Sequence, residues 1–179
     1  MVFYKKPPIL PNDDALADLE QAGHGYLAEH QYKKYEISAF CSQNKASQHN
    51  LNYWKFGDYY GIGAGAHGKL SSPDLTHIHR TQKPRQPKDY MNPNKAFISS
   101  NKIVTAADLI FEFMLNTTRL EQAIPYTLFT ERTGLALTAI MPLLKHAETK
   151  DFLILEHDHW RITPFGRRFT NDLQSLFLP

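Results

Sequence analysis

The chain has 179 residues, of which 42% are hydrophobic, so it can form one domain or two small ones with a sizeable core. Its single cysteine, Cys41, excludes an internal disulfide, a self-contained zinc ribbon and a cysteine-ligated iron–sulfur cluster, and it favours a reducing cytoplasm. No apolar run is long enough to cross a bilayer, and residues 1–8 lack the apolar core of a signal peptide.

Positive charge is concentrated in the first part of the chain. Residues 1–103 hold 13 Lys or Arg and 9 Asp or Glu, whereas residues 104–179 hold 7 and 9. The excess lies at four positions, Arg80, Lys83, Arg85 and Lys88. Neither part is basic enough to predict a nucleic-acid partner from charge alone.

The first part of the chain predicts a helix followed by a strand. Capping residues and apolar side chains at helical spacing indicate a helix from Asp13 to about His30, and residues 35–40 alternate as a strand does. A single helix and strand need neighbours to bury their apolar faces, so they indicate a piece of a larger α/β layer. Residues 71–103 are polar and rich in Pro, Lys and Asn, with a strand expected over residues 76–82.

From Val104 the pattern becomes mostly helical. Helices are predicted over 106–120, 125–132 and 135–148 and from Thr163 onward, and strands over 152–155 and 160–162. Pro142 either kinks the third helix or starts a second segment. The order of helix, turn, helix, hairpin and helix is winged-helix-like. Because the region carries net negative charge, a packing or docking module is expected, with Arg167 and Arg168 as a solvated pair.

Residues 48–67 contain the chain's densest group of candidate site residues. The group combines histidines, an amide, aromatics and spaced glycines: His49, Asn50, Tyr53, Trp54, Gly63, Gly65 and His67. In one interpretation His49 or His67 is a ligand to a metal or haem iron, Tyr53 and Trp54 form a flat apolar wall, and the glycines allow close approach. In the other, the histidines are buried and hydrogen-bonded, and the glycines form a tight strand corner.

Two further patterns, one of glycines and one of histidines, are weak evidence for a ligand site. The glycines at 63, 65 and 68 match the spacing G-x-G-x-x-G, but no helix of useful length follows, so a dinucleotide site is not expected. His77 and His79 could share a metal, but no third ligand is near in sequence, and a solvated strand edge is the simpler interpretation.

Several short motifs follow one another in a fixed order. They are Tyr35-Glu36-Ile37-Ser38, His49-Asn50-x-x-Tyr53-Trp54, Gly61-Ile62-Gly63-x-Gly65-Ala66-His67, Arg80 with Pro87-x-x-Tyr90, Glu112-Phe113 with Arg119-Leu120, and Ile162-Thr163-Pro164-x-Gly166. With these motifs almost the whole chain resembles the C-terminal part of the oxygen-independent coproporphyrinogen III oxidase-like family of radical S-adenosylmethionine (radical SAM) proteins. The His-Asn-x-x-Tyr-Trp element favours its branch of HemW-type haem chaperones. Cys41-Ser42 and Ala123 depart from the family pattern, which commonly has Ala-Arg and Gly there.

The resemblance implies an α+β fold in two parts. Residues 1–103 would be the terminal piece of a radical-SAM α/β partial barrel with a connecting segment, and residues 104–179 a HemN-type, winged-helix-like C-terminal domain. Full-length members carry an N-terminal half whose C-x-x-x-C-x-x-C loop holds a 4Fe–4S cluster that binds S-adenosylmethionine. Those cysteines are absent here. We therefore expect a fragment or a truncated gene product, not catalytic alone, whose partner is the missing radical-SAM half.

The resemblance also implies a ligand and a site. Haem or porphyrin would bind for delivery to a recipient protein in the cytoplasm, with His49 as axial iron ligand and Asn50 or a carbonyl holding its other ring nitrogen. Arg80, Lys83 and Arg85 would serve the propionates. The alternatives are part of an oxidase that decarboxylates coproporphyrinogen III, and a winged-helix interaction module without a cofactor. Whether the chain contributes to an enzyme stays open, because the family is oxidoreductase-like; neither nucleic acid nor a transmembrane segment is expected.

The cysteine count generates a first prediction. We expect the purified chain to hold no 4Fe–4S cluster after anaerobic reconstitution, because one thiolate cannot supply the ligands that such a cluster needs. Iron and acid-labile sulfide analysis checks this. A stoichiometric cluster in a monomer would contradict the prediction.

Overall fold

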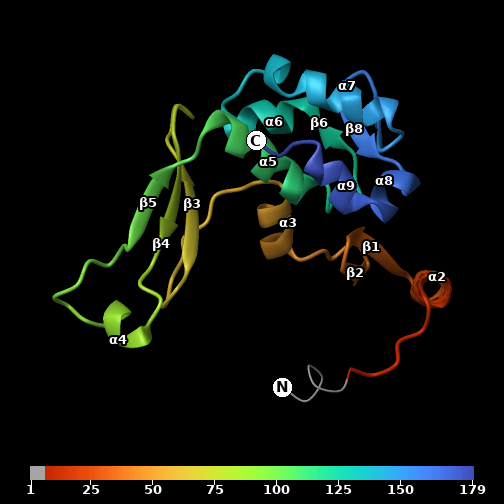
Figure 1. The fold of residues 1–179 in the computed structure, drawn as a ribbon, viewed down its shortest axis with the longest axis horizontal. Helices are drawn as coiled ribbons and strands as arrows, with labels where there is room; N and C mark the ends of the chain where they lie inside the picture. The colour runs from red at the N-terminus through yellow and green to blue at the C-terminus, as the bar shows by residue number, and fades with distance from the viewer. Residues whose placement is uncertain (1–6) are drawn as a thin grey trace.

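The computed structural model describes residues 7–179, which form a mixed α and β fold with three small antiparallel sheets (Figure 1). Residues 1–6, which bear on the signal-peptide expectation and on the start of the first predicted part, lie outside the described residues. Within residues 7–179, no helix combines the length and the apolar character that crossing a membrane requires.

The predicted first helix is confirmed as α2 (Asp13–Glu29). The side chain of Asn12 caps it by accepting a 2.8 Å hydrogen bond from the backbone N–H of Ala15. None of its residues is buried, and Leu19 and Tyr26 are 66% and 63% exposed. Among the described residues the helix packs only toward its end, where the ring centroid of His24 lies 5.3 Å from that of Phe40, so it depends largely on its cap and its local propensity.

The single strand predicted over residues 35–40 is wrong. The structure has a hairpin there, β1 (Tyr32–Glu36) paired with β2 (Ala39–Ser42), with the turn at residues 37 and 38. The Glu36 carboxylate accepts hydrogen bonds from both the backbone N–H and the hydroxyl of Ser38, at 3.1 and 2.8 Å, and so stabilises the turn. An alternating pattern does not reveal such a turn, because side chains alternate on either side of it.

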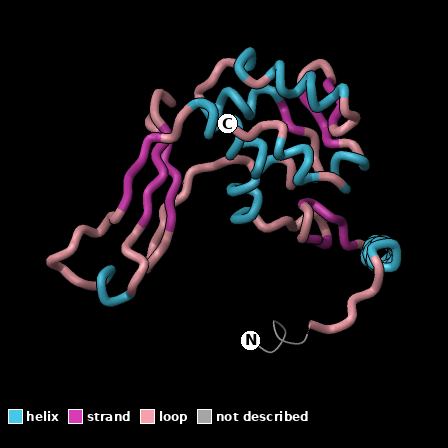
Figure 2. The backbone as a smooth tube through the Cα atoms, viewed as in Figure 1, coloured by secondary structure: helices cyan, strands magenta, loops and turns pink. Residues whose placement is uncertain are grey.

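A short helix and a projecting sheet follow. Helix α3 (Gln48–Trp54) follows Ser47, whose hydroxyl caps it by accepting a hydrogen bond from the backbone N–H of Asn50. The arm, residues 60–103, then forms a sheet in the order β3-β4-β5 with α4 at its far end (Figures 1 and 2). Its elements are β3 (His67–Ser71), β4 (Ile78–Gln82), α4 (Pro87–Tyr90) and β5 (Ser100–Ile103). The sequence predicted only β4 of this sheet and took the rest as a connecting segment.

The remaining residues form the main body, a helical layer on a small sheet of order β6-β8-β7. Its elements are α5 (Ala106–Thr117), β6 (Ile124–Pro125), α6 (Tyr126–Thr133), the 3-10 helix η1 (Leu137–Ala139), α7 (Met141–Thr149), β7 (Leu153–Leu155), β8 (His159–Ile162), α8 (Pro164–Arg168) and α9 (Thr170–Ser175). Pro142 lies at the start of α7, so it begins a second segment and does not kink one long helix. The predicted last helix is broken at Phe169, whose φ of −112° and ψ of 42° are not helical.

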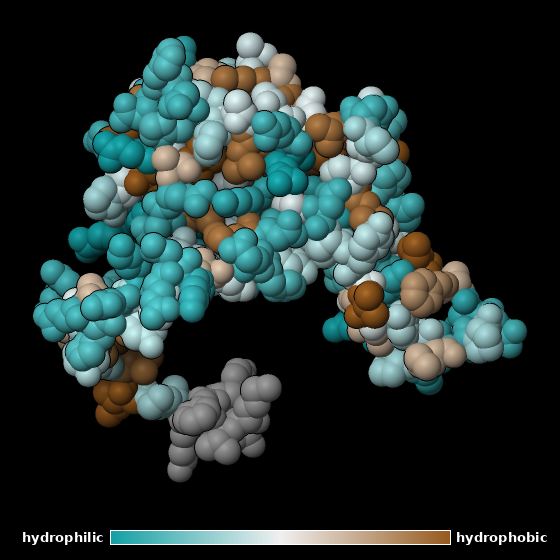
Figure 3. Space-filling view, turned by 180° about the vertical axis from the view of Figure 1, so that it is seen from behind, coloured by the Kyte–Doolittle hydropathy of each residue, from teal (hydrophilic) through white to brown (hydrophobic). Residues whose placement is uncertain are grey.

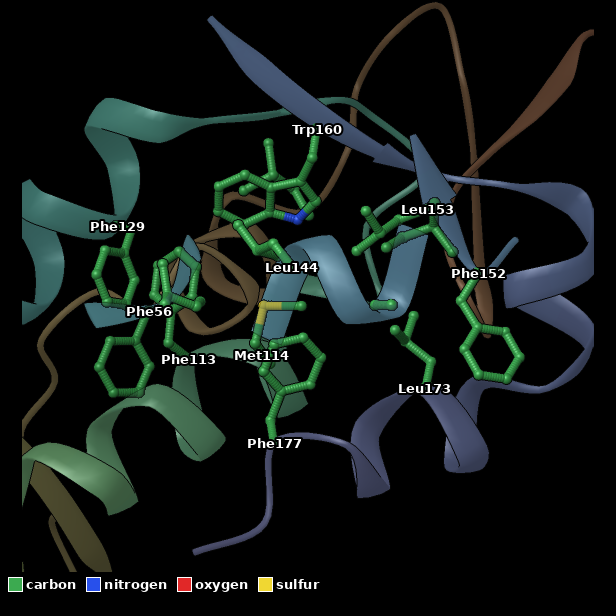
Figure 4. Close-up of a cluster of buried hydrophobic side chains, with 14 of the residues drawn as sticks. Phe56, Phe113, Met114, Phe129, Leu144, Phe152, Leu153, Trp160, Leu173 and Phe177 are labelled. Carbon is green, nitrogen blue, oxygen red and sulfur yellow. The ribbon is translucent and has the colours of Figure 1, made fainter. Parts of the chain in front are cut away.

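The hydrophobic core lies in the main body and draws on two earlier residues. Phe113 is at its centre, with its ring centroid 5.2 Å from Phe129 and 5.8 Å from Phe56 (Figure 4). Phe56 follows α3 and Ile78 begins β4, and each is only 1% exposed. These two side chains therefore anchor α3 and the arm to the body, because each buries its apolar surface in the same cluster.

Arg167 is partly buried at the surface of the main body. The side chain of Arg167 is only 20% exposed, pairs with Glu121 at 3.1 Å and donates to the carbonyl of Leu120, so the expectation of a solvated Arg167 is wrong.

Figure 3 shows α2 and the arm as projections on opposite sides of the body, with apolar residues exposed on both. On the arm these include Ile62 and Met91, which are 85% and 75% exposed.

The uneven burial predicts uneven hydrogen exchange. Amides of α2 should exchange fast through local opening, whereas those around Phe113 and Leu144, both 0% exposed, should exchange only through global unfolding. Exchange measured by mass spectrometry on the purified chain checks this. Equal protection of α2 and α5 would show that another surface, such as a second copy of the chain, covers α2.

Candidate functional site

Helix α3 carries four of the predicted site residues, and the structure divides them between two faces. His49 and Tyr53 are one turn apart and share one face, with ring centroids 4.8 Å apart. Asn50 and Trp54 share the other face. The sequence motif therefore does not form a single cluster.

The first face, the His49 face, is a row of aromatic rings. His49 is exposed at one end, Tyr53 follows, and the Tyr59 ring lies 4.3 Å from that of Tyr53. The Tyr59 hydroxyl accepts a 2.9 Å hydrogen bond from Nη1 of Arg80. The row thus leads from an accessible imidazole to the arm.

Arg80 is held by protein groups at each of its three nitrogens. Nε and Nη2 donate to one carboxylate oxygen of Glu112 on α5, Nε at 2.9 Å, while Nη1 donates to Tyr59. The two side chains of the ion pair are 27% and 26% exposed. Arg80 therefore joins the arm, the aromatic row and the main body.

The second face of α3 fastens the β1–β2 hairpin and α5. Asn50 donates from Nδ2 to the hydroxyl of Tyr35 at 3.1 Å, so it hydrogen-bonds there and has no hydrogen bond to His49. The guanidinium of Arg119 stacks 4.2 Å from the Trp54 ring centre and pairs at 3.0 Å with the buried Glu36. Trp54 is thus covered by Arg119, and the rings on the His49 face are those of Tyr53 and Tyr59, which are tilted by 43° to each other.

The glycines and His67 lie in the arm. Gly63 and Gly65 have φ of +108° and +72°, a conformation that favours glycine, and their N–H groups donate to the Tyr90 hydroxyl and the Pro84 carbonyl. This is the tight corner of the second interpretation. His67 is exposed at the start of β3, opposite Gln82, and within residues 7–179 no ring contact or hydrogen bond joins it to His49.

A buried lysine fixes the segment that carries Tyr59. Lys69 is 1% exposed, and its Nζ donates to the carbonyl of Phe56 at 3.1 Å and to Oδ1 of Asp58 at 2.8 Å. Tyr59 and Lys69 also exchange two backbone hydrogen bonds, at 2.9 and 3.0 Å. Burial lowers the pKa of Lys69, and the nearby Asp58 carboxylate opposes part of that effect.

Sequence reasoning missed several of these residues as parts of the site. Tyr35, Glu112 and Arg119 were noted only as members of family motifs, and Tyr59 was not singled out. Glu112 lies on α5, whereas Arg119 follows the end of that helix at Thr117, so their spacing of seven gave no helical signal of the two ion pairs. Lys69 gave no signal, because lysine is rarely buried.

The donor set suits an iron that already has equatorial ligands. In residues 7–179 no three His, Cys, Asp or Glu side chains gather to hold a bare metal ion. An exposed imidazole at the end of a row of two aromatic rings would suit a haem iron, because the macrocycle would supply the other nitrogen ligands. A 4Fe–4S cluster does not fit this chain, because Cys41 is its only thiol.

Known proteins match the chain along almost its whole length. Residues 104–169 match the model of the HemN C-terminal domain. The "Heme chaperone HemW" of Escherichia coli is 44% identical over 99% of this chain and 46% of its own length, and that of Haemophilus influenzae is 40% identical over 99% and 45%. The sequence-based resemblance is thereby confirmed. This chain spans about half the length of these relatives.

The structural comparison agrees on the fold. The solved coproporphyrinogen III oxidase (HemN) from Escherichia coli, described as a radical SAM enzyme, matches 94% of this chain and 42% of its own chain with a TM-score of 0.62. Its sequence is 13% identical, so the match shows a shared fold for the C-terminal part. The mixed α and β class is confirmed.

The Asp58–Lys69 pair predicts a pH dependence of stability. Burial alone would raise the pKa of Asp58, but hydrogen bonds from Lys69 and Ser71 and the charge of Lys69 outweigh it, so this pKa is lowered from 3.8. The resulting stability is present above the unfolded-state pKa and is lost as pH falls through the folded-state value. Asp58→Asn should therefore lower stability at pH 7 and flatten its dependence between about pH 5 and 2.

Urea denaturation at a series of pH values, followed by circular dichroism, measures this effect. Glu131→Gln is the control, because Glu131 is an exposed carboxylate on α6. An unchanged pH profile in Asp58→Asn would show that the pair does not contribute to folding.

Proposed function

We propose that this chain, which is homologous to the C-terminal part of heme chaperones related to oxygen-independent coproporphyrinogen III oxidase, binds haem at the His49 face for delivery to another protein. The observation that carries the proposal is an exposed imidazole at the end of a row of aromatic rings. The relatives at 40% and 44% identity are named heme chaperones, which supports it.

The residues of this face match the parts of a haem. The neutral imidazole of His49 offers a lone pair to the iron, and the rings of Tyr53 and Tyr59 offer apolar surface to the macrocycle. A bound haem would supply a large apolar ring and an iron that accepts a nitrogen ligand. Of the three cations expected for the propionates, Arg80 is held by Glu112, Lys83 is buried with Nζ 3.8 Å from the ring centre of Phe97, and Arg85 is exposed.

The other assignments rest on the relatives and on packing. The partner would be a radical-SAM half that holds the 4Fe–4S cluster and S-adenosylmethionine, and a haem recipient would act in the cytoplasm. Residues 104–179 would form a winged-helix-like domain that serves packing, because the core of that region accepts Phe56 and Ile78 from residues 1–103. The oxidase alternative has the weaker support, since the solved oxidase is 13% identical. An assay of coproporphyrinogen III decarboxylation with the N-terminal half restored separates the two.

His49→Ala is the direct test of haem ligation. We expect it to remove the shift of the Soret band seen when haemin is mixed with the wild-type chain, and to weaken binding at least about tenfold, because loss of even a ligand's hydrogen-bonding partner has that effect. His67→Ala should lose less, because His67 lies in the arm. Absorbance titration measures both.

The matched control is His157→Ala, which removes an exposed histidine from the turn between β7 and β8. Circular dichroism confirms that each variant is folded. A folded His49→Ala chain with the wild-type Soret band and affinity would show that His49 is not the ligand.

A further inference from the structure

Arg80 occupies the point where the arm, the aromatic row and the main body meet. We infer that Arg80 is a positioning residue for haem, which orients the aromatic row through Tyr59, and that it does not bind a propionate. The inference rests on the proposed function of the His49 face. It changes the role that the sequence suggested for this cation.

Each of the three nitrogens of the guanidinium already donates to a protein group, which uses three of its five N–H donors. A guanidinium is planar and presents its N–H groups in a fixed fork. One side of this fork, Nε and Nη2, points to Glu112, and Nη1 points to the hydroxyl of Tyr59. The guanidinium cannot turn toward another anion without breaking one of these contacts.

Tyr59 is thereby fixed at both ends. Its backbone exchanges two hydrogen bonds with Lys69, and its hydroxyl is held by Arg80. The ring then lies 4.3 Å from Tyr53 at an interplanar angle of 43°, and Tyr53 meets His49 edge-on at 65°. The orientation of the imidazole thus follows from a chain of contacts that begins at Glu112.

A turn of the Arg80 guanidinium toward a propionate would break these contacts. Glu112 is 26% exposed and would lose its only ion-pair partner among residues 7–179, while the Tyr59 hydroxyl would lose its donor. A partly buried carboxylate left without its partner is costly, so the ion pair favours the position shown. The contacts of Arg80 therefore favour a structural role for its guanidinium over a role as a propionate ligand.

Haemin and haemin dimethyl ester together distinguish the two roles, because the ester has no propionate charge. For a positioning residue, Arg80→Met should weaken binding of both by the same factor, about tenfold, and alter the Soret band. For a propionate ligand, only haemin binding should weaken and the ester should bind as to wild type. Arg161→Met is the matched control, since Arg161 forms an exposed pair with Glu156 at 3.6 Å on β8.

Milder variants keep the test decisive if Arg80→Met does not fold. Tyr59→Phe removes only the hydroxyl and Glu112→Gln only the charge, and each should weaken both ligands alike. Arg80→Lys keeps the charge toward Glu112 but loses the fork, so it should not restore the wild-type Soret band. Restoration of full affinity and spectrum by Arg80→Lys would overturn the inference.

A measurement without haem separates this inference from the proposed function. The ring protons of His49 report the ring current of Tyr53 in the nuclear magnetic resonance spectrum of the free chain. Tyr59→Phe should shift them and Arg161→Met should not. If the wild-type chain binds neither haemin nor its ester, the proposed function fails. If the His49 signals do not respond to Tyr59→Phe, the positioning role fails, whatever the result of the binding experiment.

Discussion

The buried ammonium of Lys69 is the contact on which the local architecture depends. It is enclosed by the carbonyl of Phe56, the carboxylate of Asp58 and the face of the Phe56 ring, 4.3 Å away. Phe56 in turn enters the core against Phe113. One charged group therefore ties the start of the arm to the end of α3 and to the main body, and its low exposure means that loss of Asp58 would leave a buried charge unpaired.

Helix α5 provides the other half of this arrangement. Glu112 on this helix pairs with Arg80 in the arm, and Arg119, just after the end of the helix, pairs with Glu36 in the hairpin. The apolar residues of α5, with Phe113 among them, enter the core. Helix α3 lies between the two ion pairs, so both of its faces are fixed while His49 stays accessible.

The sequence predicted what depends on local pattern and missed what depends on distant contacts. Helix α2 and the succession of helices after Val104 follow from caps, apolar spacing and proline. The turn after Glu36 and most of the arm were missed, because a side-chain hydrogen bond and a three-stranded sheet without strong apolar alternation give little periodic signal.

The candidate site shows the same division. The residue types around His49 were found from composition, but the motif was read as one cluster. Helical geometry instead turns Asn50 and Trp54 away from His49. Tyr59 joins the row through Tyr53, and Arg80 holds Tyr59 by a hydrogen bond that spans 21 residues. Spacing along one helix could have predicted the separation, whereas the contact between the arm and α3 required the fold.

The exposure of His49 has a consequence for how a cargo would leave. Under the proposed function, residues 7–179 would contact the haem from the side of His49, which is exposed among these residues. A recipient could then coordinate the iron before the imidazole of His49 dissociates. Transfer would proceed by ligand exchange, through a complex of this chain, haem and recipient. The rate of such a transfer would depend on the concentration of the incoming ligand.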